Sequence, residues 1–221
     1  LTCLDISPDS RCLAAVGLDG QSKQCIVLWN ITKLRSEGVA EVVTRHTTEY
    51  NIKCLKFSAY QEDNLVTAGR DSVRMYRLKN GQLRGVSVRM AAPERRVTSY
   101  AGGLSAVLGP NIFTDIAFEA GVGVFGVDAW KVYVASASGA VFQVDYHTRT
   151  LTCVYQLHSA PINCLQVLDG LCVTGADDRL LRVWPLDFRD YLLEAEHEGA
   201  VTGLGVSPDG LRVAIGTECG T

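Results

Sequence analysis

The chain has 221 residues, a formal net charge of −3, 47% apolar residues and 20% charged residues. This composition supplies a sizeable hydrophobic core and argues against a disordered chain. A nucleic-acid binder usually carries a global excess of basic residues, which this sequence lacks. A membrane-spanning helix needs about 18 consecutive apolar residues, and the sequence contains no such run.

Five β-favouring units follow one another along the chain, and their openings are alike. The first opens with Leu4–Asp9, and its pattern of an apolar pair followed by Ser-Pro-Asp returns at Leu204–Asp209 in the fifth. Proline, aspartate and glycine are turn residues, so each copy predicts a strand, a tight turn and a second strand. The units are predicted to begin near residues 1, 50, 112, 161 and 200.

The spacing of these units predicts an all-β propeller. Asp169 in the fourth unit and Asp209 in the fifth lie 40 residues apart, which is the length of a WD repeat with four strands per blade. Strand-like segments close three of the units at Trp29, Tyr76 and Trp184. Helical periodicity is nearly absent. The last unit is truncated, so we expect an incomplete propeller of about four to five blades, belonging to a larger propeller or to tandem propellers.

The fourth unit resembles the WD-repeat family in its polar residues. In such repeats a histidine, a serine or threonine, an aspartate and a tryptophan form a hydrogen-bonded tetrad, which here corresponds to His158, Thr174, Asp178 and Trp184. The chemistry is consistent, because an indole N–H can only donate and a buried carboxylate needs donors such as histidine. The second unit has a degraded version with one residue fewer before its aromatic residue: His46, Thr67, Asp71 and Tyr76.

Three further segments resemble one particular WD-repeat family. Leu157–Asn163, Trp184–Phe188 and Leu193–Gly199, together with Gly69–Arg74, are similar to the centriolar and ciliary family of WD repeat-containing protein 90, which includes an algal proteome-of-centriole protein. The resemblance covers most of the chain. It implies a non-catalytic scaffold in the cytoplasm and cytoskeleton, at the centriole, basal body or axoneme, with tubulin, the microtubule wall or other centriolar and ciliary proteins as partners.

The same resemblance has near alternatives. In this family a microtubule-associating module precedes tandem propellers, and no such module is recognised in these residues. Echinoderm microtubule-associated proteins and other flagellar WD proteins carry similar implications. An alternative from another class is a substrate receptor or adaptor subunit of a larger complex, such as a ubiquitin ligase. None of these readings involves nucleic acid or a membrane.

No catalytic, cofactor or metal site is predicted. Gly121-x-Gly123-x-x-Gly126 matches a dinucleotide fingerprint, but Asp128–Val134 after it is strand-like where the fingerprint needs a helix, so a glycine-rich hairpin is expected. His46, His158 and His197 recur at matching places in their repeats, and matching positions are dispersed around a propeller instead of converging on a metal.

One region departs from the repeat. Tyr76 and Val144 occupy matching positions but lie 68 residues apart, so an insertion of roughly 25 residues is expected at about 82–111. The region carries one acid, Glu94, and four arginines. Insertions in propellers tend to lie on a binding face. The arginines therefore suggest a partner-binding loop for acidic proteins, although a solvated loop with incidental charge also accounts for them: Arg84, Arg89, Arg95 and Arg96.

None of the eight cysteines forms a Cys-x-x-Cys pair, and most lie in apolar runs, so we expect reduced core residues of an intracellular protein. A disulfide-bonded secreted domain is the alternative, with Asn30-Ile31-Thr32 as a glycosylation sequon.

Leu1 is not an initiator methionine, so we expect a piece of a longer protein, stable only with the rest of its propeller.

Overall fold

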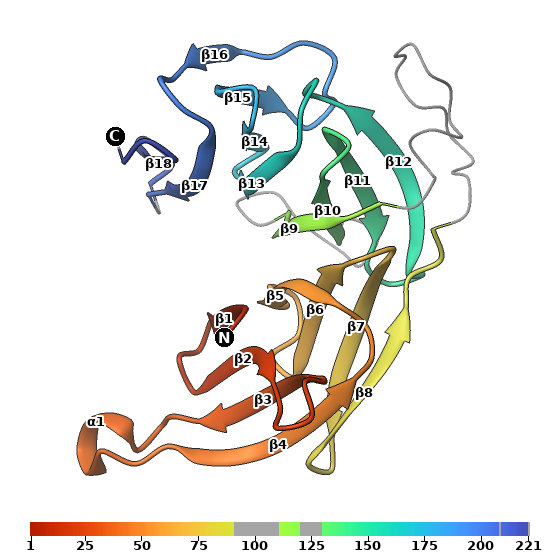
Figure 1. Ribbon diagram of the computed structural model, residues 1–221, viewed down its shortest axis with the longest axis vertical. Coiled ribbons are helices and arrows are strands. Elements are labelled where there is room, and N and C mark those ends of the chain that lie inside the picture. Colours follow the sequence, from red (N-terminus) through yellow and green to blue (C-terminus); the bar gives the residue numbers. More distant parts are fainter. Residues whose placement is uncertain (91–110, 120–129, 208, 221) are drawn as a thin grey trace. The chain divides into compact units, whose positions relative to one another are not determined.

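The structure is a computed structural model that describes residues 1–90, 111–119, 130–207 and 209–220. The chain divides into two compact units, Leu1–Val88 (unit 1) and Arg89–Thr221 (unit 2). Antiparallel strands form nearly all of the regular structure in the described residues, which confirms the predicted all-β propeller class (Figure 1). No helix among these residues is long and apolar enough to cross a membrane.

Unit 1 contains two four-stranded antiparallel sheets, blade 1 and blade 2, each a meander in which consecutive strands pair. Blade 1 consists of β1 (Cys3–Ile6), β2 (Cys12–Leu18), β3 (Gln24–Asn30) and β4 (Glu41–Thr48), and α1 (Leu34–Glu37) lies between β3 and β4. Blade 2 consists of β5 (Ile52–Phe57), β6 (Asn64–Gly69), β7 (Ser72–Lys79) and β8 (Gln82–Ser87). The first strands of the two blades, β1 and β5, pack against each other.

Unit 2 repeats this arrangement. Blade 3 consists of β9 (Phe113–Phe118), β10 (Lys131–Ser136), β11 (Ala140–Asp145) and β12 (Thr150–Gln156). Blade 4 consists of β13 (Ile162–Leu168), β14 (Leu171–Ala176), β15 (Leu180–Pro185) and β16 (Leu193–Glu196). A two-stranded sheet, β17 (Val201–Val206) with β18 (Val213–Thr217), follows. The first strands again pack in sequence, β9 against β13 and β13 against β17 (Figure 1).

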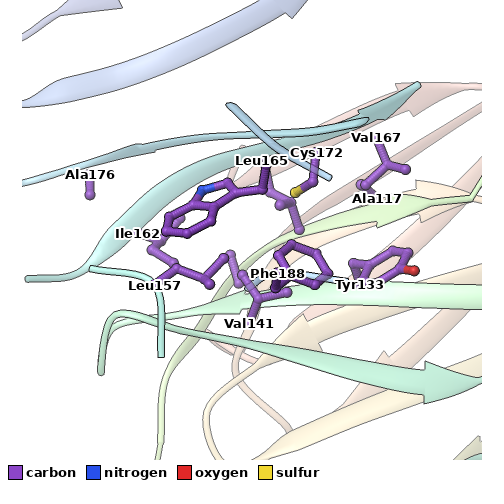
Figure 2. Packing of buried hydrophobic residues seen from close by; sticks show 12 residues of the cluster. Ala117, Tyr133, Val141, Leu157, Ile162, Leu165, Val167, Cys172, Ala176 and Phe188 are labelled. Atoms are coloured by element: carbon purple, nitrogen blue, oxygen red, sulfur yellow. The ribbon is translucent and has the colours of Figure 1, made fainter. Parts of the chain in front are cut away.

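The hydrophobic core lies between the faces of neighbouring blades. In unit 2, Tyr133 and Val141 of blade 3 pack with Leu165, Cys172 and Trp184 of blade 4, and Figure 2 shows this cluster at close range. In unit 1 a similar cluster joins the two blades: Ala14, Val16, Ile26 and Leu28 with Ile52, Leu55, Phe57, Leu65, Tyr76 and Leu83. Because strand side chains alternate between two faces, each blade contributes every second residue to such a layer.

Polar side chains also join one blade to the next. In unit 1 the Asp5 carboxylate accepts the backbone N–H of Phe57 at 2.7 Å, from blade 1 to blade 2. In unit 2 the Asp115 carboxylate accepts the N–H of Leu165 at 2.9 Å, from blade 3 to blade 4. Both acceptors lie on the first strand of their blade. These bonds satisfy backbone donors within the blade interface.

The structure changes the prediction for the start of the inserted segment. The spacing of the units predicts an insertion at about 82–111, but Gln82–Ser87 forms β8 and completes blade 2 as its fourth strand. The reason is the dipeptide Asn80-Gly81, whose φ angles of 52° and 72° make a two-residue hairpin turn. Positive φ at both central residues matches the twist of the flanking strands. The rest of the insertion, residues 91–110, lies outside the described residues.

Candidate functional site

The polar centre of blade 4 is built from two of its strands, the turn between them and the segment that precedes the blade. Thr174 lies in β14, Trp184 in β15 and Asp178 in the turn between them, while His158 lies four residues before β13. The indole N–H of Trp184 donates to Thr174 Oγ1 at 3.0 Å. Thr174 Oγ1 lies 2.7 Å from His158 Nε2, and His158 Nδ1 lies 3.0 Å from an Asp178 carboxylate oxygen. The structure thus brings the four predicted side chains into one hydrogen-bonded chain.

The order of donors and acceptors in this chain follows from its two ends. The Trp184 indole only donates and a carboxylate only accepts, so His158 Nδ1 carries the proton that Asp178 accepts. A neutral His158 then accepts the Thr174 hydroxyl proton at Nε2. Burial lowers the pKa of His158 below its ordinary value, although the Asp178 carboxylate opposes this shift. The lowered pKa favours the neutral ring, in which every polar hydrogen is used once.

Arg182 extends the network toward the blade surface. Its guanidinium donates to the carbonyl of Leu157 at 2.5 Å and to the Glu194 carboxylate at 2.7 Å. It also lies over the rings of Trp184 and Tyr191, with centroid distances of 5.8 and 5.3 Å. Sequence reasoning missed Arg182, although its strand position could be read from Trp184, which lies two residues further along β15.

The degraded tetrad of unit 1 is not joined in this way. His46 lies inside β4, the last strand of blade 1, six residues before β5, and its ring meets the Tyr76 ring edge-on at 5.4 Å. Neither Thr67 Oγ1 nor the Tyr76 hydroxyl has a hydrogen-bond partner among the described residues. Asp71 is exposed and occupies the left-handed position of a two-residue turn, at φ 58°.

The missing residue in the β6–β7 turn explains this difference. In blade 4 three residues separate β14 from β15, and Arg179, at φ 67°, takes the left-handed position, which leaves Asp178 to turn inward. In blade 2 only Arg70 and Asp71 separate the strands, so the aspartate itself takes that position. Blade 2 instead uses Tyr50, whose hydroxyl donates to the carbonyl of Ser72.

The third recurring histidine has a different environment. His197 lies four residues before β17, as His158 lies four residues before β13. Its Nε2 is buried without a hydrogen-bond partner among the described residues. The strand register places Ile215, which has no hydroxyl, opposite Leu204, where Thr174 stands opposite Leu165 in blade 4. His158 and His197 therefore lie in separate environments. Among the described residues, no group of His, Cys, Asp or Glu is arranged to hold a metal ion.

The predicted arginine loop is divided by the structure. Arg84 lies in β8 of unit 1 and is exposed, so it belongs to a strand instead of a loop. Arg89 belongs to unit 2, where its backbone N–H donates to the carbonyl of Arg149 at 2.9 Å. Arg95 and Arg96 lie outside the described residues, as does the Gly121–Gly126 motif.

A family model and several relatives match this chain. The model described as WD domain, G-beta repeat matches residues 149–185, which contain β12 to β15 and all four members of the blade 4 tetrad. Centriole proteome protein 16 of Chlamydomonas reinhardtii is 71% identical over 223 residues, covering 100% of this chain and 11% of that protein. WD repeat-containing protein 90 is 32% identical in Xenopus tropicalis and 31% in Homo sapiens, each over 98% of this chain.

The similarity to the curated relatives covers only part of their length. The chain spans about a tenth of the length of the curated relatives, with 12% and 13% of the two WD repeat-containing proteins covered. Among solved structures, the β-propeller domain of Cps50 (Swd1) from Myceliophteria thermophila matches with a TM-score of 0.70 at 14% identity, over 98% of this chain and 67% of that one. At this identity the structural match establishes the fold alone.

Proposed function

Because this chain is a WD-repeat β-propeller segment that is similar to Centriole proteome protein 16 over its whole length, we propose that it is a non-catalytic scaffold of a centriole- or cilium-associated protein. The observation that carries the proposal is the 71% identity, which extends over 100% of this chain. Propeller blades are rigid, and their connections present a broad surface for other proteins. The proposed partners are tubulin, the microtubule wall or other centriolar and ciliary proteins.

The interior of blade 4 supports a structural role for its polar residues. His158 and Thr174 are 3% and 0% exposed, so a substrate would not reach the imidazole. Each polar hydrogen of the chain from Trp184 to Asp178 already has an acceptor. Such a network positions strands and satisfies buried polar groups, and leaves partner binding to the exposed surface.

The proposal is tested by locating the full-length protein that contains this chain. A fluorescent tag is expected to overlap a centriole or axoneme marker in ciliated cells, and a purely diffuse signal would contradict the proposal. A second form of the full-length protein lacks residues 1–221 of this sequence. It distinguishes the part of the protein that determines localisation from the part that recruits partners. Proximity labelling should recover tubulin or centriolar proteins with the intact form and fewer of them with the deleted form. Recovery of ubiquitin-ligase subunits in their place would also contradict it.

A further inference from the structure

Blade 2 differs from the other blades in the charge of its strands. Its four strands contain six lysines and arginines and no aspartate or glutamate, whereas the strands of blades 1, 3 and 4 each contain one basic and two acidic residues. The basic residues of blade 2 are Lys53, Lys56, Arg74, Arg77, Lys79 and Arg84. Acidic residues near this blade lie in connections, at Glu49, Glu62, Asp63 and Asp71.

Three of these cations gather on one face of the β7–β8 hairpin. Arg77 stands directly opposite Arg84 in the register, and Lys79, two residues along β7, stands opposite Gln82. Residues directly opposite and residues two apart point to the same side of a sheet, at Cβ separations of about 5 and 7 Å. All three side chains are exposed. We call Arg77, Lys79 and Arg84 the basic hairpin.

The basic hairpin is not neutralised by the described part of the chain. None of its three side chains takes part in an ion pair among the described residues. In blade 4, by contrast, Arg179 and Arg182 each pair with a glutamate of β16 at 2.7 Å. Like charges directly opposite one another destabilise a strand pair. An anionic partner would remove that repulsion on binding.

We propose that the basic hairpin is a docking surface for an acidic polypeptide segment rich in glutamate or aspartate. The inference rests on the proposed scaffold function and states the chemistry of one partner. Val86, which is 47% exposed, lies opposite Met75 on the same face and offers apolar contact beside the charges. The basic surface spans one hairpin within a chain of net charge −3, so it suits a short acidic segment better than a long nucleic acid.

The test measures binding of a fluorescein-labelled glutamate decamer to the full-length protein that contains this chain. The triple variant Arg77→Gln, Lys79→Gln and Arg84→Gln is expected to bind at least about tenfold more weakly, because charge complementarity provides most of the attraction. The matched control removes the same charge from other exposed positions of unit 1: Lys23→Gln, Arg35→Gln and Arg45→Gln. It is expected to stay within about twofold of the parent protein.

A single variant protects the test against loss of folding. Arg84→Glu places an acid directly opposite Arg77, so it should leave the melting temperature unchanged or raise it slightly while weakening decamer binding. A purely structural role for Arg84 predicts that stability and binding fall together, which would overturn the proposal. So would equal losses in the triple variant and its control.

The choice of probe separates the partner classes. A single-stranded RNA of equal charge and vesicles with anionic lipid are expected to bind more weakly than the glutamate decamer, and with little sensitivity to the triple variant. Stronger RNA or vesicle binding that depends on the basic hairpin would overturn the proposal, as would undetectable decamer binding by the parent protein. Localisation of the tagged protein to centrioles is independent of these outcomes, so a failure here is distinguishable from failure of the scaffold function.

Discussion

The Oγ1 atom of Thr174 accepts the indole N–H of Trp184 at 3.0 Å, and both residues are almost completely buried in blade 4. The matching pair in blade 2, Thr67 and Tyr76, is equally buried, but neither hydroxyl has a hydrogen-bond partner among the described residues. The two blades therefore provide a matched comparison. The same threonine position carries a hydrogen-bonded hydroxyl in one blade and an unbonded hydroxyl in the other.

We predict that Thr174→Val destabilises the protein while Thr67→Val does not. Valine keeps the shape of threonine, but in blade 4 it leaves the Trp184 donor and His158 Nε2 without a partner, at a cost of about 1–3 kcal/mol. In blade 2 it removes a buried hydroxyl that has no bond to lose. Thermal or denaturant unfolding of the propeller-containing protein measures both changes. Equal destabilisation by the two substitutions would contradict the prediction.

The hydrogen-bond order in blade 4 predicts the protonation state of His158. The ring should be neutral at pH 7, with its proton on Nδ1, because Asp178 accepts at that nitrogen and the Thr174 hydroxyl donates to Nε2. Nitrogen-15 chemical shifts of labelled histidine distinguish this tautomer from the other tautomer and from imidazolium. His158→Gln assigns the signal, and a charged ring at pH 7 would show that burial does not dominate.

The same histidine predicts a direction for the pH dependence of stability. Burial lowers the folded-state pKa of His158 below its ordinary 6.5, so the unfolded chain takes up a proton first as the pH falls. The free energy of unfolding should therefore decrease as the pH drops from about 7 through 6.5 toward the lowered pKa, and level off below it. Burial also lowers the pKa of His46, with the same sign. The difference between the parent protein and His158→Gln isolates the contribution of His158.

Repeat spacing and turn residues were sufficient to predict the architecture. The Ser-Pro-Asp turns and the 40-residue step identify strands whose hydrogen bonds are local, because each blade is a meander of sequence neighbours. The members of the blade 4 tetrad were identifiable through the resemblance of the fourth unit to WD repeats. The strand register carries Thr174 and Trp184 to neighbouring positions once the turn length is right.

Errors arose where a single residue changes a turn. One residue fewer between β6 and β7 moves Asp71 into the left-handed turn position. The shorter spacing from Asp71 to Tyr76 is visible in the sequence, but it does not show which residue takes that position. The 68-residue spacing from Tyr76 to Val144 assigns β8 to the insertion, although Asn80-Gly81 is a strong hairpin signal. That signal also fixes the pairing of Arg77 with Arg84, so the basic hairpin could have been found from the sequence.

Glycines at two strand positions give a prediction about backbone packing. A Cβ atom on Gly69 would lie 1.9 Å from the carbonyl oxygen of Asn51, whereas one on Gly203 would meet nothing within 4 Å. Gly69→Ala should therefore force β5 and β6 apart and cost more than about 2 kcal/mol. Gly203→Ala should be neutral or slightly stabilising, because alanine loses less backbone entropy on folding. The two melting temperatures test this, and similar values would show that the β5–β6 edge adapts freely.

The bonds between neighbouring blades give the last prediction. Asp5 lies at the interface of blades 1 and 2, where burial raises its pKa and its carboxylate accepts the Phe57 N–H at 2.7 Å. Asp5→Asn keeps an acceptor oxygen and carries no charge to desolvate, so we expect little change in stability. Asp5→Leu leaves the Phe57 N–H unsatisfied and should cost about 1–3 kcal/mol.

Amide hydrogen exchange at Phe57 is the direct readout of this bond. Leucine at position 5 should increase the exchange rate of the Phe57 amide, while asparagine should leave it protected. The Leu165 amide, bonded to Asp115 in unit 2, serves as the internal control, because Asp5 lies in the other unit. If both amides lose protection together in Asp5→Leu, the substitution acts by global unfolding. If neither does, the carboxylate does not hold the interface of blades 1 and 2.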